Sequence, residues 1–347
     1  MATTKDYASI TSRSQNYNVI DIVKLLCSIM VFTIHVPPIV APIGMNLTAL
    51  ENQINFWFQQ CFCRIAVPFF FTASSFFLFA KMSEDRIDID RTKKYCFKLL
   101  RLLGIWSILP LVGEGPQLWY LGGTVTAITF ISLCLYFRVN DICLIVIACL
   151  LYGLGLLGDS YKGFVDWLVE SINHPSASII EKTWSLVSQR SRNGLFMGTI
   201  FVLMGMYFAK GKIKTKLWPN IFGFVCSLSC LIIEAHLLNN YQLSADHNMY
   251  ISLVPVTFYL FSLSCSIQLK DRPIYLKIRS IGLLVYFLHL GIDSLVGYMI
   301  RTLYQFASIN IQPYQYLLSL TLTCFIAVGI EVLSDSNHFK WLRWFYS

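Results

Sequence analysis

The stretch "VIDIVKLLCSIMVFTIHVPPIV", residues 19–40, decides the fold because it is long and apolar enough to cross a bilayer as a helix. It nevertheless carries three ionisable side chains, Asp21, Lys24 and His35. On a helix Lys24 and His35 differ by only about 20° around the axis and lie roughly 16 Å apart along it. Asp21 and Ser28 fall close to the same line. A charge near the bilayer centre costs at least about 2.5 to 3.5 kcal/mol, so this polar stripe predicts a passage inside a helix bundle.

Two simpler interpretations of this stripe remain open. Asp21 and Lys24 could form an ion pair in the interfacial zone at the helix end. His35 could be a hydrogen-bonded structural histidine, placed just before Pro37 and Pro38 end the helix.

The composition of the chain supports a membrane setting. Of the 347 residues 56% are hydrophobic and 13% are charged, and the mean hydropathy is +0.59, whereas soluble domains are about one quarter charged. The net charge of +8 could suggest nucleic acid, but Lys and Arg cluster in short loops between apolar runs, as orientation in a bilayer requires. We therefore expect the lipid bilayer, and not nucleic acid, as a partner. The first apolar run predicts an uncleaved first helix and no signal peptide.

The apolar runs predict an all-α polytopic bundle of about ten transmembrane helices in a single domain, residues 1–347, in the plasma (inner) membrane. With both termini cytoplasmic, 20 of the 27 basic residues fall inside and five outside. The count is least secure over residues 95–158. The external loop, about 159–192, contains an expected interfacial helix with Trp167 and Trp184 as anchors. The predicted spans are 19–40, 54–80, 95–112, 118–137, 141–158, 193–209, 218–238, 249–268, 280–301 and 314–334.

Other ionisable residues lie in or beside these spans. Arg64 stands four residues before Pro68, where a helix irregularity is expected. A buried guanidinium needs a partner, which is either a protein carboxylate or an anionic ligand such as a phosphate. Lys98 and Arg101, in "KKYCFKLLRLLGIW", could hold negative charge at the cytoplasmic edge or serve as ordinary positive-inside anchors. The pair Tyr286 and His289 is more simply a packed, hydrogen-bonded pair.

Taken in order, five motifs resemble the acyltransferase family 3, the integral membrane O-acyltransferases that modify surface carbohydrates. Lys24 and His35 match the family's opening pair, and "RIAVPFFFTASSFF" resembles its "R-x-x-VP-FF-x-x-SG" stretch, with Ser75 in place of glycine. "LWYLGG", "SRNGLFMGTIFVLMG" and "SIGLLVYFLH" resemble later elements. The Arg-x-x-Arg of some members is here Lys98-x-x-Arg101. The resemblance covers almost the whole chain.

This resemblance implies an enzyme that moves an acyl group, most simply acetyl, from cytoplasmic acyl-CoA (acetyl-CoA) to a hydroxyl of a carbohydrate or similar acceptor. No metal is implied. The implied roles are catalytic for His35, as general base, and Arg64, as oxyanion or phosphate ligand. Lys24, Lys98 and Arg101 are expected to bind the co-substrate, and Trp119, Arg192, Tyr286 and His289 to line the acceptor path.

Two other classes of function stay open. About ten spans with buried charge also describe a multi-pass transporter or permease for a small polar solute such as an amino acid. One branch of the resembled family, the membrane half of certain serine racemases, is linked to amino-acid uptake. Because no racemase domain follows residue 347, the sequence favours a separate transferase. A structural protein would have little need to align Lys24 with His35.

Overall fold

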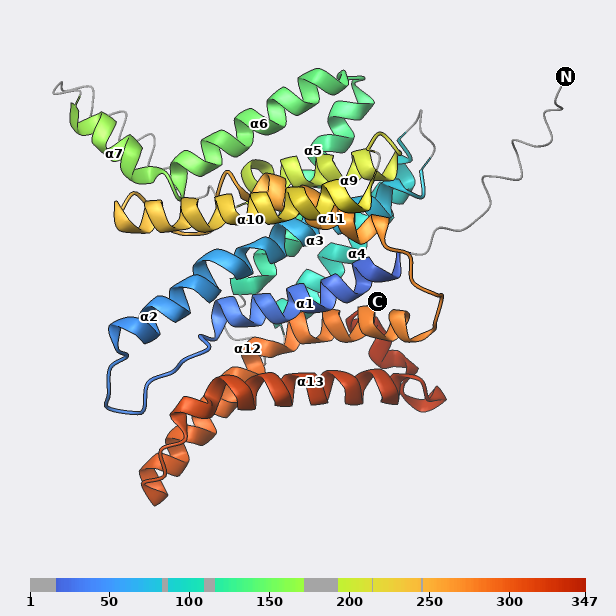
Figure 1. The fold of residues 1–347 in the computed structure, drawn as a ribbon. Coiled ribbons are helices and arrows are strands. Elements are labelled where there is room, and N and C mark those ends of the chain that lie inside the picture. The colour runs from blue at the N-terminus through green and yellow to red at the C-terminus, as the bar shows by residue number, and fades with distance from the viewer. Residues whose placement is uncertain (1–16, 83–86, 109–115, 172–192, 214, 245) are drawn as a thin grey trace, which may run out of the picture.

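The computed structural model describes residues 17–82, 87–108, 116–171, 193–213, 215–244 and 246–347. Within these ranges the regular structure is helical, and Figure 1 shows most of the helices lying side by side along one common direction. The α-helices are α1 (Asn18–His35), α2 (Ala49–Phe56), α3 (Ala66–Phe79), α4 (Ile89–Ile108), α5 (Trp119–Tyr136), α6 (Asp141–Gly158), α7 (Lys162–Ser171), α9 (Thr199–Ala209), α10 (Leu217–Asn240), α11 (Leu253–Ser266), α12 (Ile274–Ala307) and α13 (Gln315–Ser334).

The first helix, α1, packs along α12, which in turn packs on α13. Two features fix the first contact. The guanidinium of Arg279 donates to both carboxylate oxygens of Asp21, at 2.8 and 2.7 Å. On the same face Gly282 approaches the backbone of Leu25 so closely that an added Cβ would lie 3.3 Å from its Cα. α1 ends at His35, two residues before Pro37, so the prolines end the helix as expected but the predicted span 19–40 is too long at this end.

The second apolar run is one long helical rod with an irregular middle. α2 begins at a capping box in which Thr48 and Glu51 exchange hydrogen bonds. A π-helical turn (Trp57–Cys61) and a 3-10 turn (Phe62–Ile65) then precede α3. The irregularity that Pro68 predicts is therefore present, because proline has no N–H to donate to the carbonyl of Arg64. Arg64 is the third residue of this 3-10 turn and is buried.

On its other side α3 contacts α9 and α5, and α6 packs on α9. A π-helical turn (Gly194–Gly198) leads into α9, and Asn193 caps it by accepting from the N–H groups of Leu195 and Phe196. Gly194 lies against the backbone of α5, where an added Cβ would stand 1.9 Å from the carbonyl oxygen of Gly123. Only glycine allows this approach.

Seven helical runs of the described chain are long and apolar enough to cross a membrane, which supports a multi-pass membrane protein. Each predicted range overlaps a helix of the described residues, but the prediction of about ten full spans is not confirmed. α4 carries too many charges, and the runs Gly194–Ala209 and Leu253–Ser266 are short. The predicted span 280–301 is part of the longer α12.

The predicted external loop is described only in part. Residues 162–171 form the helix α7, which buries none of its residues and leaves Trp167 60% exposed. No face of the helix is buried, and its place at a membrane interface stays a prediction. The rest of the loop, including Trp184, lies outside the described residues.

Candidate functional site

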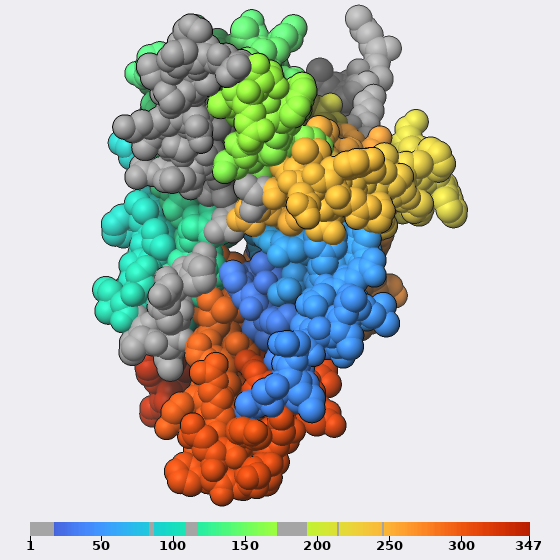
Figure 2. All heavy atoms as spheres, turned by 90° about the vertical axis from the view of Figure 1, so that its left-hand side faces the viewer, coloured from blue at the N-terminus to red at the C-terminus, as the bar shows by residue number. Residues whose placement is uncertain are grey.

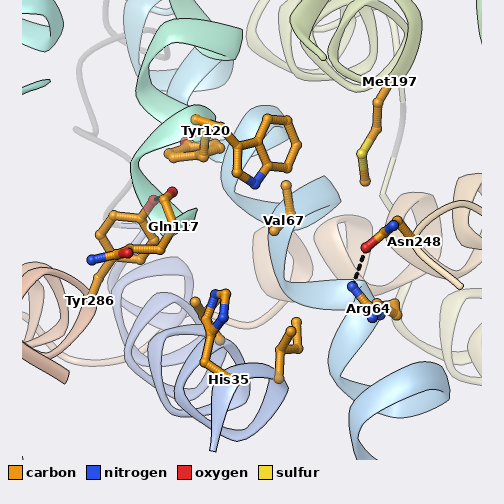
Figure 3. A pocket seen from close by; sticks show the side chains of 11 residues that line it. His35, Arg64, Val67, Gln117, Tyr120, Met197, Asn248 and Tyr286 are labelled. Carbon is orange, nitrogen blue, oxygen red and sulfur yellow. Dashed lines mark hydrogen bonds between the residues drawn. The ribbon is translucent and has the colours of Figure 1, made fainter. Parts of the chain in front are cut away.

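A small cavity lies between the end of α1, the 3-10 turn before α3, the start of α5 and α12, and we name it the His35 cavity (Figure 3). Its volume is about 40 Å³, enough for a few water molecules but not for a larger ligand in this conformation. Figure 2 views the end of the molecule at which α1 finishes and shows a hollow between α1, α12 and the chain that follows α10. The cavity is lined by Val31, Ile34, His35, Arg64, Val67, Gln117, Trp119, Tyr120, Met197, Asn248 and Tyr286.

Arg64 supplies the fixed positive charge of the His35 cavity. It is 9% exposed, and its guanidinium donates to the side-chain oxygens of Asn248 and Gln60. Both acceptors are neutral amides, so these two bonds orient the guanidinium without neutralising it. The sequence left open whether Arg64 meets a protein carboxylate or an anionic ligand, and the structure adds two amides as direct partners.

Asn248 is held in turn by Asp159, which follows α6. The carboxylate of Asp159 accepts from the backbone N–H of Asn248 at 2.9 Å and from its Nδ2 at 3.1 Å, and also from the N–H of Met249 and the hydroxyl of Ser160. Burial raises the pKa of Asp159 above its ordinary value, although these hydrogen bonds oppose the shift. The bond from Nδ2 fixes the amide of Asn248 with its oxygen toward Arg64. Asp159, Asn248 and Arg64 therefore form one chain of hydrogen bonds.

Gln117 contributes the most unusual group of the cavity. It is 2% exposed, and neither its Oε1 nor its Nε2 has a hydrogen-bond partner among the described residues. Its backbone oxygen accepts from the hydroxyl of Tyr286. An unpartnered buried amide costs free energy unless a ligand or water completes it. Gln117 thus offers an acceptor and a donor to the contents of the cavity.

Two histidine rings pack against each other at the end of α1, tilted by 32°. The rings of His35 and His289 lie 5.5 Å apart between centroids. His289 is fully buried, and its Nδ1 donates to the carbonyl of Tyr286 at 2.8 Å, which leaves Nε2 as the acceptor. This Nε2 has no partner in the described part of the chain. The predicted pairing of Tyr286 with His289 therefore runs through the backbone, while the Tyr286 hydroxyl bonds to Gln117.

A second, larger cavity of about 210 Å³ lies further toward the start of α1, and we name it the Lys24 cavity. Lys24, Lys98 and Arg279 all line it. Arg279 pairs with Asp21, whereas Lys24 and Lys98 have no ion-pair partner among the described residues. The alternative of an Asp21–Lys24 ion pair is thus wrong, because Arg279 takes both oxygens of Asp21.

The two cavities share two walls, Tyr120 and Tyr286. These rings lie 6.0 Å apart, and Phe70 packs against both. The stripe on α1 was predicted to form one wall of a continuous passage, but it divides here. Lys24 and Ser28 face the Lys24 cavity and His35 faces the other.

The other predicted site residues divide into two groups. His35, Arg64, Trp119 and Tyr286 are brought together at the His35 cavity, and His289 lies behind His35. Arg101 does not join Lys24 and Lys98; it donates to the backbone oxygen of Ser347 at 2.6 Å and stacks on Trp344. Arg192 lies outside the described residues. Three residues of the site were not predicted from the sequence, namely Gln117, Asn248 and Asp159, and only the polar run "ADHN" before an apolar stretch marks one of them.

Known proteins do not support the acyltransferase interpretation. No family model and no solved structure matches the chain. The chain is similar to an amino-acid racemase of Enterococcus faecalis, with 25% identity over 75% of the chain, and to a serine/alanine racemase of Enterococcus gallinarum, with 27% over 70%. A second amino-acid racemase of Enterococcus faecalis is 22% identical over 78%. The matches span only 37%, 36% and 40% of these relatives.

These names correct several predictions together. Relatives named for amino-acid racemisation contradict membership of the acyltransferase family, transfer of an acetyl group and acyl-CoA as co-substrate. The role of His35 as general base on a carbohydrate hydroxyl, and that of Lys24, Lys98 and Arg101 as CoA ligands, lose their basis with that reaction. All three relatives are named for a reaction of amino acids.

Proposed function

We propose that this chain is a single membrane domain that binds a small neutral amino acid and carries it across the bilayer. We place it in the plasma membrane with about ten spans and both termini in the cytoplasm, as the distribution of basic residues suggests. The relatives support an amino acid as the solute, and one of them names serine and alanine. The buried polar groups of the His35 cavity support a binding site for it.

The observation that carries this proposal is that Arg64 and Gln117, both buried, line the same cavity. A neutral amino acid presents a carboxylate and an ammonium group a short distance apart. The planar fork of Arg64 suits the carboxylate. Gln117 Oε1 accepts from the ammonium group, and the ring faces of Trp119 and Tyr120 attract its positive charge.

The rest of the cavity favours a small side chain. Its apolar walls come from Val31, Val67 and Met197, which leave little room beside the polar groups. At about 40 Å³ the cavity must widen before the solute enters. A cavity that is closed in one conformation and open in another is the expected behaviour of an alternating-access carrier.

The test is uptake of L-[14C]serine and L-[14C]alanine into liposomes that contain the purified chain. Arg64→Gln removes the proposed carboxylate contact, and we expect at least about a tenfold loss of initial uptake, since a hydrogen bond to a charged group contributes about 1.5–3 kcal/mol. Arg64→Lys keeps the charge but loses the fork, and an intermediate loss is expected. Arg91→Gln is the matched control, because Arg91 pairs with Asp88 on the surface, away from both cavities.

Each outcome of this assay bears on the proposal. Wild-type liposomes that accumulate no more label than empty ones would rule out transport of these amino acids. Equal loss in the Arg64 and Arg91 variants would rule out the carboxylate contact. Chiral analysis of the recovered serine adds a further arm: D-serine formed by the purified chain alone would replace the carrier proposal with racemisation.

A further inference from the structure

We infer that the Lys24 cavity is a second carboxylate site on the same path, on the predicted cytoplasmic side of a septum formed by Tyr120 and Tyr286. This inference rests on the proposed function for its ligand. Its structural basis is separate, since it depends on the charges and the volume of a different cavity.

The charge of the Lys24 cavity favours an anion. Three basic side chains line it, and no acidic residue is among its described lining. The charge of Arg279 is compensated by Asp21, which lies 2.7 Å away and is itself buried. The ammonium groups of Lys24 and Lys98 remain without an acidic partner in the described chain, and two like charges facing one space repel each other until an anion separates them.

The size and surroundings of the cavity indicate a small organic anion. Its volume of about 210 Å³ is roughly five times that of the His35 cavity. Phe70, Phe77 and Leu102 supply apolar walls, while Ser28 and Ser74 supply hydroxyls. Lys98 is exposed at the mouth of the cavity, and Lys24 is less exposed. Together they allow the carboxylate of an amino acid to bind while the apolar part of the amino acid lies against the aromatic rings.

The two tyrosines explain why the sites are separate in this conformation. The hydroxyl of Tyr286 is tied to the backbone of Gln117, and that of Tyr120 bonds to Ser74 at 2.8 Å. Each ring is buried and faces both cavities. In this conformation the site at His35 is the smaller of the two and the site at Lys24 is the larger. When the ligand passes the two rings, its carboxylate leaves Arg64 in one cavity and binds Lys24 in the other.

Binding to the purified chain in detergent tests this site without any need for transport. We expect Lys24→Gln to weaken equilibrium binding of L-[14C]serine about tenfold, because one charged hydrogen-bond donor is lost. Lys24→Arg should restore binding to within about threefold. Lys98→Gln, at the mouth and therefore safer for folding, should weaken binding about threefold. Lys94→Gln, on the same helix and exposed, is the matched control and should bind as wild type. L-Serinamide, which has no carboxylate, should bind wild type and Lys24→Gln equally.

Three results would overturn the inference: unchanged serine binding in both lysine variants, equal weakening by Lys94→Gln, or tighter binding of inorganic phosphate than of serine by the wild type. The two proposals fail separately. Uptake into liposomes with no effect of Lys24→Gln on binding leaves transport and removes the second site. Binding that depends on Lys24 without any uptake leaves the site and removes transport.

Discussion

The hydrogen-bond chain from Asp159 through Asn248 to Arg64 makes the substitution Asp159→Asn informative. Asp159 is 3% exposed and accepts four hydrogen bonds. Asparagine keeps the shape and three of the bonds, but its Nδ2 would face Nδ2 of Asn248, donor against donor. Losing a hydrogen bond to a charged acceptor costs about 1.5–3 kcal/mol, partly offset because a buried charge is removed, so we expect about 2 kcal/mol less stability.

The functional effect of this substitution follows from the geometry of Asn248. To avoid the clash its amide turns over and presents Nδ2, a donor, to the guanidinium of Arg64. Arg64 then leaves its position, and we expect the KM for serine uptake to rise about tenfold while the maximal rate changes much less. Chemical denaturation in detergent measures the stability, and the liposome assay measures the KM. Asp166→Asn is the control, because Asp166 is exposed and pairs weakly with Lys162.

A double substitution separates structure from binding. In Asp159→Asn with Asn248→Asp, the new amide donates to the new carboxylate, so stability should return to within about 1 kcal/mol of wild type. The carboxylate at position 248 would then face Arg64 directly and compete with the carboxylate of the solute, so the KM should stay high. An unchanged KM in the single variant, together with reduced stability, would refute the idea that Asp159 positions Arg64.

The remaining predictions concern stability in detergent. Burial, reinforced by the positive charge of Arg64, lowers the pKa of His247 below 6.5. The neutral ring therefore contributes its full stability above about pH 6.5, and this contribution is lost as the pH falls. In His247→Gln the melting temperature should fall less steeply toward acid pH than in the wild type. Tyr286→Phe leaves the carbonyl of Gln117 without its donor and should cost about 1–3 kcal/mol by chemical denaturation. Gly194→Ala forces apart α5 and the turn before α9 and should cost about 3 kcal/mol or prevent folding, whereas Gly153→Ala, which meets nothing within 4 Å, should be neutral or slightly stabilising.

Local features of this fold were predictable because they depend on neighbouring residues. The end of α1 follows from Pro37 and Pro38, and the irregular turn at Arg64 follows from Pro68. The presence of helices over the apolar runs follows from length and composition alone. The exact number of spans did not follow from the sequence. α4 is charged at its start, and α9 and α11 are short, so whether each crosses the bilayer depends on how the neighbouring helices cover it.

The partners within the site were not predictable in the same way. Asn248 lies 184 positions after Arg64, and Asp159 lies 89 positions before Asn248. No periodicity links such distant positions, so the sequence could say only that Arg64 needs a partner. The same holds for Asp21, whose partner Arg279 comes from the opposite end of the chain. Gln117, in the 3-10 turn Pro116–Leu118, was not predicted because a single amide in a sequence gives no sign that it is buried away from water.

The motifs that resembled an acyltransferase have structural roles here that explain why they misled. Asn193 caps a π-helical turn, Gly194 allows contact with Gly123, and Pro68 sets the irregular turn that presents Arg64. These residues fix how the helices meet, whatever molecule enters the cavities. A scaffold of this kind serves different chemistries, and its function depends on the few side chains that face the ligand. In the proposed function those side chains include Gln117, which no motif contained and which lines the same cavity as Arg64.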